Sequence, residues 1–181
     1  MLVNCAGIAP AAKTAGRNRE AGEPRTHDLG LFEKAISINL VGTFRCIAKL
    51  SAGMMTLEPL DAQGSRGATS TPPRSRGRTG QISQASSAAS KAGVLAMTPP
   101  LTRHLINEGI RVNTILPGNF ESPMMAGMPK RVQGSIAAMA PFPKRLGKAA
   151  EYAECALFLL GHDHMNGECV RPDDMIHMGR R

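Results

Sequence analysis

Short strand-like segments alternate with helical patterns along this chain of 181 residues, and the alternation restricts its fold more than any other feature. Three short runs are typical of buried strands: 2–4, 110–115 and 168–170. Helical spacing of apolar residues follows Asp28 and Gly42 and recurs over 85–105 and 149–160. Strands separated by helices predict an α/β fold, a doubly wound parallel sheet with helices on both faces.

Two stretches conflict with this pattern. Residues 62–80 are rich in Arg, Pro and Gly, yet they stand where the alternation needs a central strand. Proline cannot donate to a strand ladder and arginine is costly to bury, so we expect an anomalous basic loop there. Pro99-Pro100 lies inside the helical pattern 85–105 and costs roughly 3 kcal/mol per proline unless the helix kinks. Residues 11–26 are polar and are also expected to form a loop.

The composition narrows the classes of partner. Hydrophobic residues make up 42% of the chain and charged residues 20%, which is typical of a single globular domain. Aromatic residues make up 3% and tryptophan is absent, which disfavours recognition of nucleic acid by base stacking. The formal charge of +8 favours acidic partners such as nucleotides, CoA-type substrates or nucleic acid. A basic solvated surface explains the same charge equally well.

The cysteines and histidines argue against disulfide and metal chemistry. The four cysteines form no C-x-x-C pair, so we expect neither a disulfide framework nor a zinc site, and a reducing, intracellular compartment rather than secretion. His162-Asp163-His164 lacks further ligands and is interpreted as a solvated turn. No apolar run is long enough to cross a bilayer, and the first residues resemble the middle of a domain rather than a signal or transit peptide.

Five short motifs occur in the order in which the short-chain dehydrogenase/reductase family carries them. They are Asn4-Cys5-Ala6-Gly7, Asn39-Leu40-Val41-Gly42, Ser87 to Lys91, Pro117-Gly118 followed by Ser122, and Asn166-Gly167-Glu168. The chain therefore resembles this family over nearly its whole length. Its likeness is greatest to the branch of type 2 3-hydroxyacyl-CoA dehydrogenases, also named 17β-hydroxysteroid dehydrogenases of type 10. The segments that carry this second likeness are 141–147, 150–153 and 165–168.

The resemblance implies a Rossmann-like sheet and a set of site residues. It implies one partial domain over 1–181 that starts at the family's fourth strand, truncated before the first β-α-β units. The implied cofactor is NAD or NADP. The residues implied to bind it are Asn4, Ala6, Gly7, Lys91, Pro117, Gly118 and Ser122, and those implied to be catalytic are Asn39 and Lys91. Taken alone, each has an ordinary interpretation, such as a helix-boundary cap for Asn39 or a solvated side chain for Lys91.

The departures from the family bear on activity. Ser87 stands at the tyrosine position of Y-x-x-x-K, Arg74 stands at the position of the catalytic serine, and the usual D-G near the end reads Asp173-Asp174. The Gly-rich turn that would hold the pyrophosphate is absent from these residues. A serine hydroxyl is a far weaker acid than a tyrosine phenol, so neither Ser87 nor Arg74 is expected to function. The chain's one tyrosine, Tyr152, belongs to a different helix.

Three functions are therefore weighed. By resemblance, the chain is an NAD(P)-dependent oxidoreductase that acts on the CH–OH group of 3-hydroxyacyl-CoA or hydroxysteroid-like substrates. On physical grounds we rank above this a catalytically dead fragment or partial gene product in which cofactor binding fails. A non-enzymatic role of the basic segment 66–78, including RNA binding, ranks last. The resemblance also implies homo-oligomers, a cytoplasmic or mitochondrial location, and no membrane partner.

Overall fold

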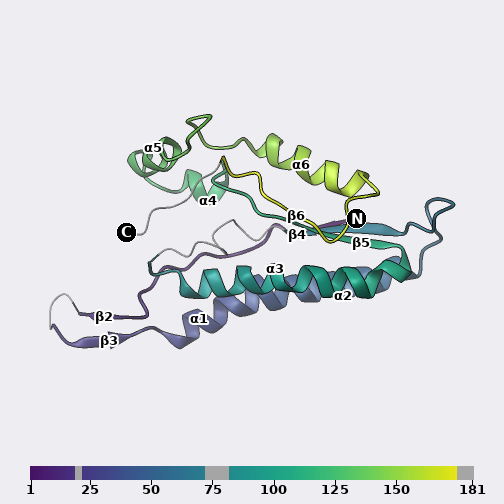
Figure 1. Ribbon diagram of the computed structural model, residues 1–181. Helices are drawn as coiled ribbons and strands as arrows, with labels where there is room; N and C mark the ends of the chain where they lie inside the picture. Colours follow the sequence, from purple (N-terminus) through teal and green to yellow (C-terminus); the bar gives the residue numbers. More distant parts are fainter. Residues whose placement is uncertain (19–21, 72–81, 175–181) are drawn as a thin grey trace.

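A parallel sheet of four strands lies at the centre of the molecule (Figure 1). The computed structural model describes residues 1–18, 22–71 and 82–174. The strands follow the order β1 (Leu2–Val3), β4 (Gly67–Thr71), β5 (Ile110–Ile115) and β6 (Cys169–Val170). Each neighbouring pair runs parallel, which confirms the predicted α/β class. The expected strand at 2–4 is less buried than predicted, because β1 pairs only with β4 among the described residues and Val3 is 37% exposed.

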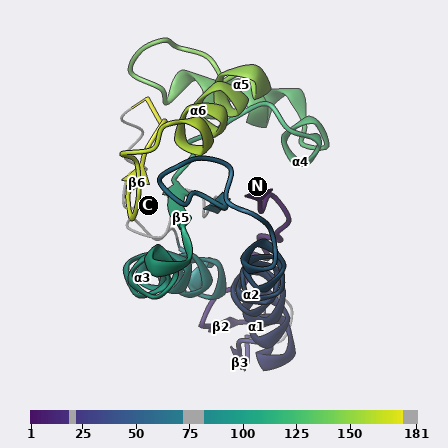
Figure 2. The ribbon, with the colours of Figure 1, turned by 90° about the vertical axis from the view of Figure 1, so that its right-hand side faces the viewer.

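Helices cover both faces of the sheet, as Figure 2 shows end-on. One face carries α1 (Leu29–Ile36), the π-helical turn η1 (Ser37–Val41), α2 (Gly42–Met55) and α3 (Ala85–Leu105), which ends in the 3₁₀ turn η3 (Ile106–Glu108). The other face carries α6 (Ala149–Gly161), with the short α4 (Pro123–Ala126) and α5 (Lys130–Ala138) leading into it. This doubly wound arrangement is the one that the alternation of strands and helices predicts.

Each face of the sheet has its own apolar core. Under α2 and α3, Ile47 and Met54 pack with Leu105, Ile110 and Val112. Under α6, Ile115 packs with Ala156 and Leu159, and the half-buried Tyr152 lies against this group. Full burial of one large apolar side chain contributes about 1.5–3 kcal/mol, so β5 supplies a large share of the stabilisation by facing both cores.

The basic loop expected over 62–80 contains the central strand β4. Gly67–Thr71 pair with both β1 and β5, and Thr69 and Ser70 are fully buried. The prolines and most of the arginines of that stretch fall in 72–81, outside the described residues. Small side chains let β4 fit between two helical layers, but the hydroxyls of Thr69, Ser70 and Thr71 have no hydrogen-bond partner in the described structure. Each such hydroxyl costs about 1–3 kcal/mol, so the predicted conflict persists as unpaired polar groups.

The prediction of a loop over 11–26 is wrong for two short segments within it. Ala15–Arg17 (β2) and Pro24–Thr26 (β3) form an antiparallel hairpin that projects beyond the N-terminal end of α1 (Figure 1). Arg17 Nη1 donates to the Gly22 carbonyl oxygen at 3.0 Å, and Gly22 has φ 67°, a conformation that glycine adopts without strain. These strands carry no apolar alternation because the hairpin is mostly solvent-exposed, so the sequence lacked the usual strand signal.

Two details of the predicted helices can be compared with the structure, the start of α1 and the two prolines inside α3. Asp28 caps α1, since its Oδ1 accepts from the amides of Gly30 at 2.9 Å and Leu31 at 3.4 Å. α3 continues through Pro99 and Pro100, both of which are exposed, whereas the sequence predicts a kink or a high cost there. The facing side of α3 is tied to β5 by a hydroxyl pair, Thr98 Oγ1 and Thr114 Oγ1 at 2.6 Å, and by Thr102 Oγ1, which donates to Val112 O at 3.2 Å.

Candidate active site

A cavity of about 110 Å³ opens where β1 and β4 end. Its lining includes five of the predicted site residues, Asn4, Ala6, Gly7, Asn39 and Lys91, together with Cys5, Ile8, Ala9, Thr43, Thr71, Ser90, Val94 and Met124. Carboxyl ends of parallel strands are where ligands bind in open α/β sheets. The structure therefore brings together residues that lie far apart in the chain. Sequence reasoning missed Thr71 and Ser90, whose small polar side chains carry no motif of their own.

The side-chain amide of Asn39 forms hydrogen bonds to the loop after β1 and is not left open for a ligand. Its Oδ1 accepts from Ile8 N at 2.8 Å, and its Nδ2 donates to Ile8 O at 2.9 Å and to Ser90 Oγ at 3.2 Å. Both amide hydrogens are therefore used within the protein. Asn39 sits in the π-helical turn η1, a backbone form that is frequent at functional sites. The close approach also explains Gly7, because a Cβ there would lie 3.1 Å from Asn39 Oδ1.

Ser87 and Lys91 contact each other one turn apart on α3. Lys91 Nζ donates to Ser87 Oγ at 2.7 Å, and Ser90 Oγ donates to Ser87 O at 3.0 Å. Ser87 is 0% exposed and Lys91 is 7% exposed. Lys91 lines the cavity, whereas Ser87 is not among its lining residues in the described part of the chain. The hydroxyl at the tyrosine position thus accepts a hydrogen bond inside the protein and does not face the space in which a ligand would lie.

Three predicted cofactor residues line a second cavity of about 200 Å³. Pro117, Gly118 and Ser122 meet there with Cys5, Phe120, Glu121, Ala149 and Tyr152. Ser122 caps α4, since its Oγ accepts from Met125 N at 3.2 Å. Gly118 allows the chain near Asp173 to pass closely, because a Cβ on it would lie 2.7 Å from Asp173 Cα. Among the described lining residues, Cys5 alone is common to both cavities.

Tyr152 lies on the opposite face of the sheet from Lys91. It belongs to α6, whereas Lys91 belongs to α3, and Figure 2 shows these helices on different sides of the sheet. Its ring packs edge-on against Phe120 at 6.0 Å between centroids, and Cys5 Sγ donates to its hydroxyl at 3.9 Å. Burial, and then the neighbouring Cys5, raise the pKa of the Tyr152 phenol well above its ordinary value. Tyr152 therefore offers no substitute acid near neutral pH.

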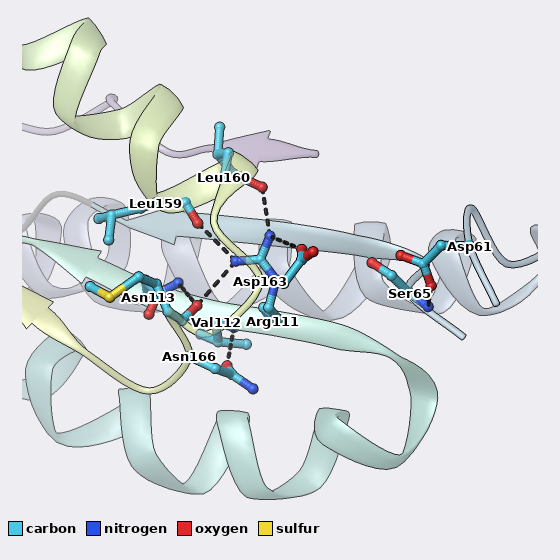
Figure 3. A network of polar contacts seen from close by, with 10 residues as sticks. Asp61, Ser65, Arg111, Val112, Asn113, Leu159, Leu160, Asp163 and Asn166 are labelled. Carbon is cyan, nitrogen blue, oxygen red and sulfur yellow. Dashed lines mark hydrogen bonds and ion pairs between the residues drawn. The ribbon is translucent and has the colours of Figure 1, made fainter. Parts of the chain in front are cut away.

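The last motif, Asn166-Gly167-Glu168, anchors the chain to β5. Asn166 Oδ1 accepts from Val112 N at 2.9 Å (Figure 3). In addition, Glu168 N donates to Asn113 Oδ1 at 3.1 Å. Beside them, Arg111 donates to three carbonyl oxygens, those of Leu159 at 2.8 Å, Leu160 at 2.6 Å and Met165 at 3.0 Å. This motif is therefore structural.

The His162-Asp163-His164 segment, interpreted from the sequence as a solvated turn, lies close by. Asp163 is 66% exposed in its side chain and lies 3.6 Å from Arg111 Nη2, in agreement with a solvated turn. In the described residues, no group of three or more His, Cys, Asp or Glu side chains could hold a metal ion. The four cysteine thiols are free.

Two further expectations concern the ends of the site. Arg74, at the position of the catalytic serine, lies outside the described residues, as does most of the basic segment 66–78. Asp173, in the altered D-G pair, is 7% exposed and its carboxylate accepts from Arg171 Nε. Its neighbour Asp174 has φ 53°, a conformation that glycine adopts more readily, and burial raises the pKa of its carboxyl.

In the described residues, no helix is long and apolar enough to cross a membrane.

A whole dinucleotide does not fit either of these two cavities. Pockets that enclose a drug-sized ligand measure about 300–1,000 Å³. The two cavities measure about 110 and 200 Å³, and the residues predicted to bind the cofactor are divided between them. The unpaired Asn4 Nδ2 and Thr71 Oγ1 beside the first cavity suit a small polar group, such as one end of a larger ligand.

The sheet order, the turn after β1 and the two cavities at the strand ends define a Rossmann-like α/β domain. A family model described as enoyl-(acyl carrier protein) reductase matches residues 1–173. The 3-hydroxyacyl-CoA dehydrogenase type-2 of Drosophila melanogaster is 41% identical over 178 residues, which is 98% of this chain and 68% of the relative. The human protein of the same name is 42% identical over 98% of this chain and 66% of its own length.

A solved structure agrees with these sequence relatives. The 3-hydroxyacyl-CoA dehydrogenase type-2 from Mycobacterium avium superposes with a TM-score of 0.89 at 36% identity, covering 99% of this chain and 67% of that one. The chain belongs to the short-chain dehydrogenase/reductase family. It spans about two thirds of the length of the relatives that it matches. The family and the fold implied by the five motifs are thus confirmed.

Proposed function

We propose that this chain descends from NAD(P)-dependent dehydrogenases of 3-hydroxyacyl-CoA or hydroxysteroid-like alcohols and does not itself turn over such substrates. The names of its type-2 relatives support the substrate class. The observation that carries the loss of activity is the buried contact of Ser87 Oγ with Lys91 Nζ at 2.7 Å. The chain is therefore proposed to be a pseudoenzyme of its family.

The argument for inactivity rests on proton transfer. By resemblance, the missing tyrosine exchanges a proton with the substrate oxygen, and a lysine four residues later lowers its pKa from about 10. A serine hydroxyl is a much weaker acid, and Ser87 is buried away from the cavity. Loss of a general acid or base costs typically 10²–10⁴-fold in rate. Lys91 and Asn39 remain, but the tyrosine phenol that they would assist by resemblance is replaced by Ser87.

Cofactor binding is proposed to fail in the 181-residue polypeptide. The residues implied to bind the dinucleotide are divided between two cavities of about 110 and 200 Å³, and neither is large enough to enclose it. NADH fluorescence is expected to stay unchanged on mixing with the purified chain. Saturable micromolar binding would contradict this part of the proposal while leaving the argument about Ser87 intact.

The decisive assay is oxidation of 3-hydroxybutyryl-CoA with NAD⁺, followed through NADH. We expect no turnover by the natural chain and none by Ser87→Tyr, because a restored phenol lacks a bound cofactor. The human type-2 relative, run in parallel, verifies the reagents. Turnover by Ser87→Tyr would show that the remaining site is intact and that the natural chain lacks only the tyrosine.

Two further observations support proposals about the oligomeric state of the protein and its cellular compartment. Val41, Phe44 and Leu50 on η1 and α2 are 37%, 46% and 45% exposed, which supports a homo-oligomer that covers this face. The four free thiols support a reducing, intracellular compartment. The described part of the basic segment does not support RNA binding, because Arg66 Nε and Nη1 donate to the carbonyl oxygens of Leu57 and Glu108.

A further inference from the structure

Cys5 brings an exposed thiol to the first cavity, at the ends of β1 and β4. It lies two residues after the end of β1, and it also lines the second cavity beside Tyr152. The proposed function gives this thiol no role. What distinguishes Cys5 from the other exposed cysteines, Cys46 and Cys169, is the set of polar groups that share its cavity.

Two polar groups of the first cavity have no hydrogen-bond partner in the described structure. They are Asn4 Nδ2 and Thr71 Oγ1, and Thr71 is only 3% exposed. Val3 pairs with Ser70 in the parallel register, so Asn4 and Thr71 follow at matching positions on neighbouring strands. A buried polar group without a partner is costly, and a ligand oxygen that accepts from both groups removes that cost.

The charge of this cavity suits an oxygen that gains negative charge. Lys91 is the one charged residue in its described lining, which contains no carboxylate. A cation in the wall of a partly enclosed site stabilises negative charge that develops on a ligand. The cavity thus combines a nucleophilic sulfur with two unpaired polar groups and a positive charge.

We propose that Cys5 is a site of covalent modification by small α,β-unsaturated aldehydes or ketones. The carbonyl oxygen of such a compound accepts from Asn4 Nδ2 and Thr71 Oγ1, which polarises the conjugated double bond. Cys5 Sγ forms a bond to the β-carbon, the C=C π bond breaks, and its electron pair gives an enolate. The thiol proton ends on the α-carbon, so the addition needs no oxidant, reductant or leaving group.

The cavity also selects the kind of electrophile. Its volume of about 110 Å³ is below the range of about 300–1,000 Å³ found for drug-sized ligands, so it suits a small aldehyde or ketone. An alkyl halide carries no oxygen beside its reacting carbon and gains nothing from Asn4 and Thr71. The modification requires neither dehydrogenase activity nor a nicotinamide, and it therefore goes beyond the proposed function.

The test compares two small reagents at each cysteine. Methyl vinyl ketone is a conjugate acceptor with a carbonyl oxygen, whereas allyl bromide alkylates thiols by displacement and contains no oxygen. The full 181-residue chain is treated with limiting amounts of each reagent, and the labelling rates of Cys5, Cys46 and Cys169 are measured by peptide mass spectrometry. The ratio of the two rates at one cysteine cancels differences in exposure and in thiolate fraction.

We expect the ketone-to-bromide ratio at Cys5 to exceed the ratios at Cys46 and Cys169 by at least about ten-fold. Thr71→Val removes one donor at nearly constant volume and should lower the ratio at Cys5 by at least about three-fold. The matched control is Thr69→Val. The hydroxyl of Thr69 is also buried and unpaired in the described structure, but Thr69 is not among the described lining residues of the cavity. Both variants should fold, because each loses a costly unpaired hydroxyl.

Equal ratios at the three cysteines overturn the proposal, and so does an equal effect of the two valine variants. If Thr71→Val fails to fold, the comparison of Cys5 with Cys46 and Cys169 in the natural chain decides. Neither a hydroxyl substrate nor a nicotinamide enters the experiment, so a negative result leaves the proposed loss of dehydrogenase activity untouched. Turnover by Ser87→Tyr would refute that loss without bearing on the labelling of Cys5.

Discussion

Replacement of Arg111 by methionine is expected to destabilise the chain more than any surface change. The Arg111 side chain is 13% exposed. Its guanidinium donates to the carbonyl oxygens of Leu159, Leu160 and Met165, which lie at the end of α6 and in the turn into β6 (Figure 3). Methionine keeps much of the apolar stem but removes all three donors. A buried acceptor that loses its partner costs about 1–3 kcal/mol, so the three together cost at least about 3 kcal/mol. That is a large share of the roughly 5–15 kcal/mol by which domains are stable.

The assay is urea unfolding followed by far-UV circular dichroism, with the natural chain and two controls. Asp163→Asn removes only the exposed ion partner of Arg111 and should cost less than about 1 kcal/mol. Arg111→Lys keeps the charge and loses the fork that reaches several carbonyls, so its cost should fall between the other two. A cost below about 1 kcal/mol for Arg111→Met would refute the reasoning that these bonds hold the end of α6.

Three further outcomes can be checked directly. Arg145, through its hydrogen bonds, lowers the pKa of Glu151 from 4.5 to about 2. The resulting stabilisation is present above the unfolded pKa and is lost as pH falls from about 5 to 2, so the natural chain should lose its advantage over Glu151→Gln in that window of melting experiments. Gly118→Ala should cost about 1–3 kcal/mol in urea unfolding, because the added Cβ meets the backbone of Asp173 at 2.7 Å; an unchanged midpoint would show that the segments separate freely. Finally, fluorescence titration with NADH should show no saturable binding by the natural chain.

Regular elements with strong local patterns were predicted well from the sequence. The helix over 85–105 and the strand over 110–115 have the predicted bounds, because caps, turns and apolar spacing act over a few residues. β4 was missed because its five residues are small and polar, and their burial comes from helices on both sides rather than from their own pattern. The hairpin of β2 and β3 was missed because it buries little surface and so leaves no apolar period.

The arrangement of the candidate site was likewise predictable only in part from the sequence. The i,i+4 spacing of Ser87 and Lys91 on a helix already places them together, and the structure gives their contact at 2.7 Å. The role of Asn39 was not readable, because its partner Ile8 lies 31 residues away in the chain. The separation of Tyr152 from Lys91 could not be predicted either, because it depends on which face of the sheet each helix covers.

The sequence by itself determined the family, the order of strands and helices, and the replacement of the family's tyrosine by Ser87. These properties depend on residue identity and on interactions between near neighbours. Only the tertiary structure decided that the predicted cofactor residues divide between two cavities that share Cys5, and that Asn4 and Thr71 line the first of them together with this thiol. Such groupings arise from packing between distant segments, where burial and hydrogen-bond geometry depend on partners that no local pattern specifies.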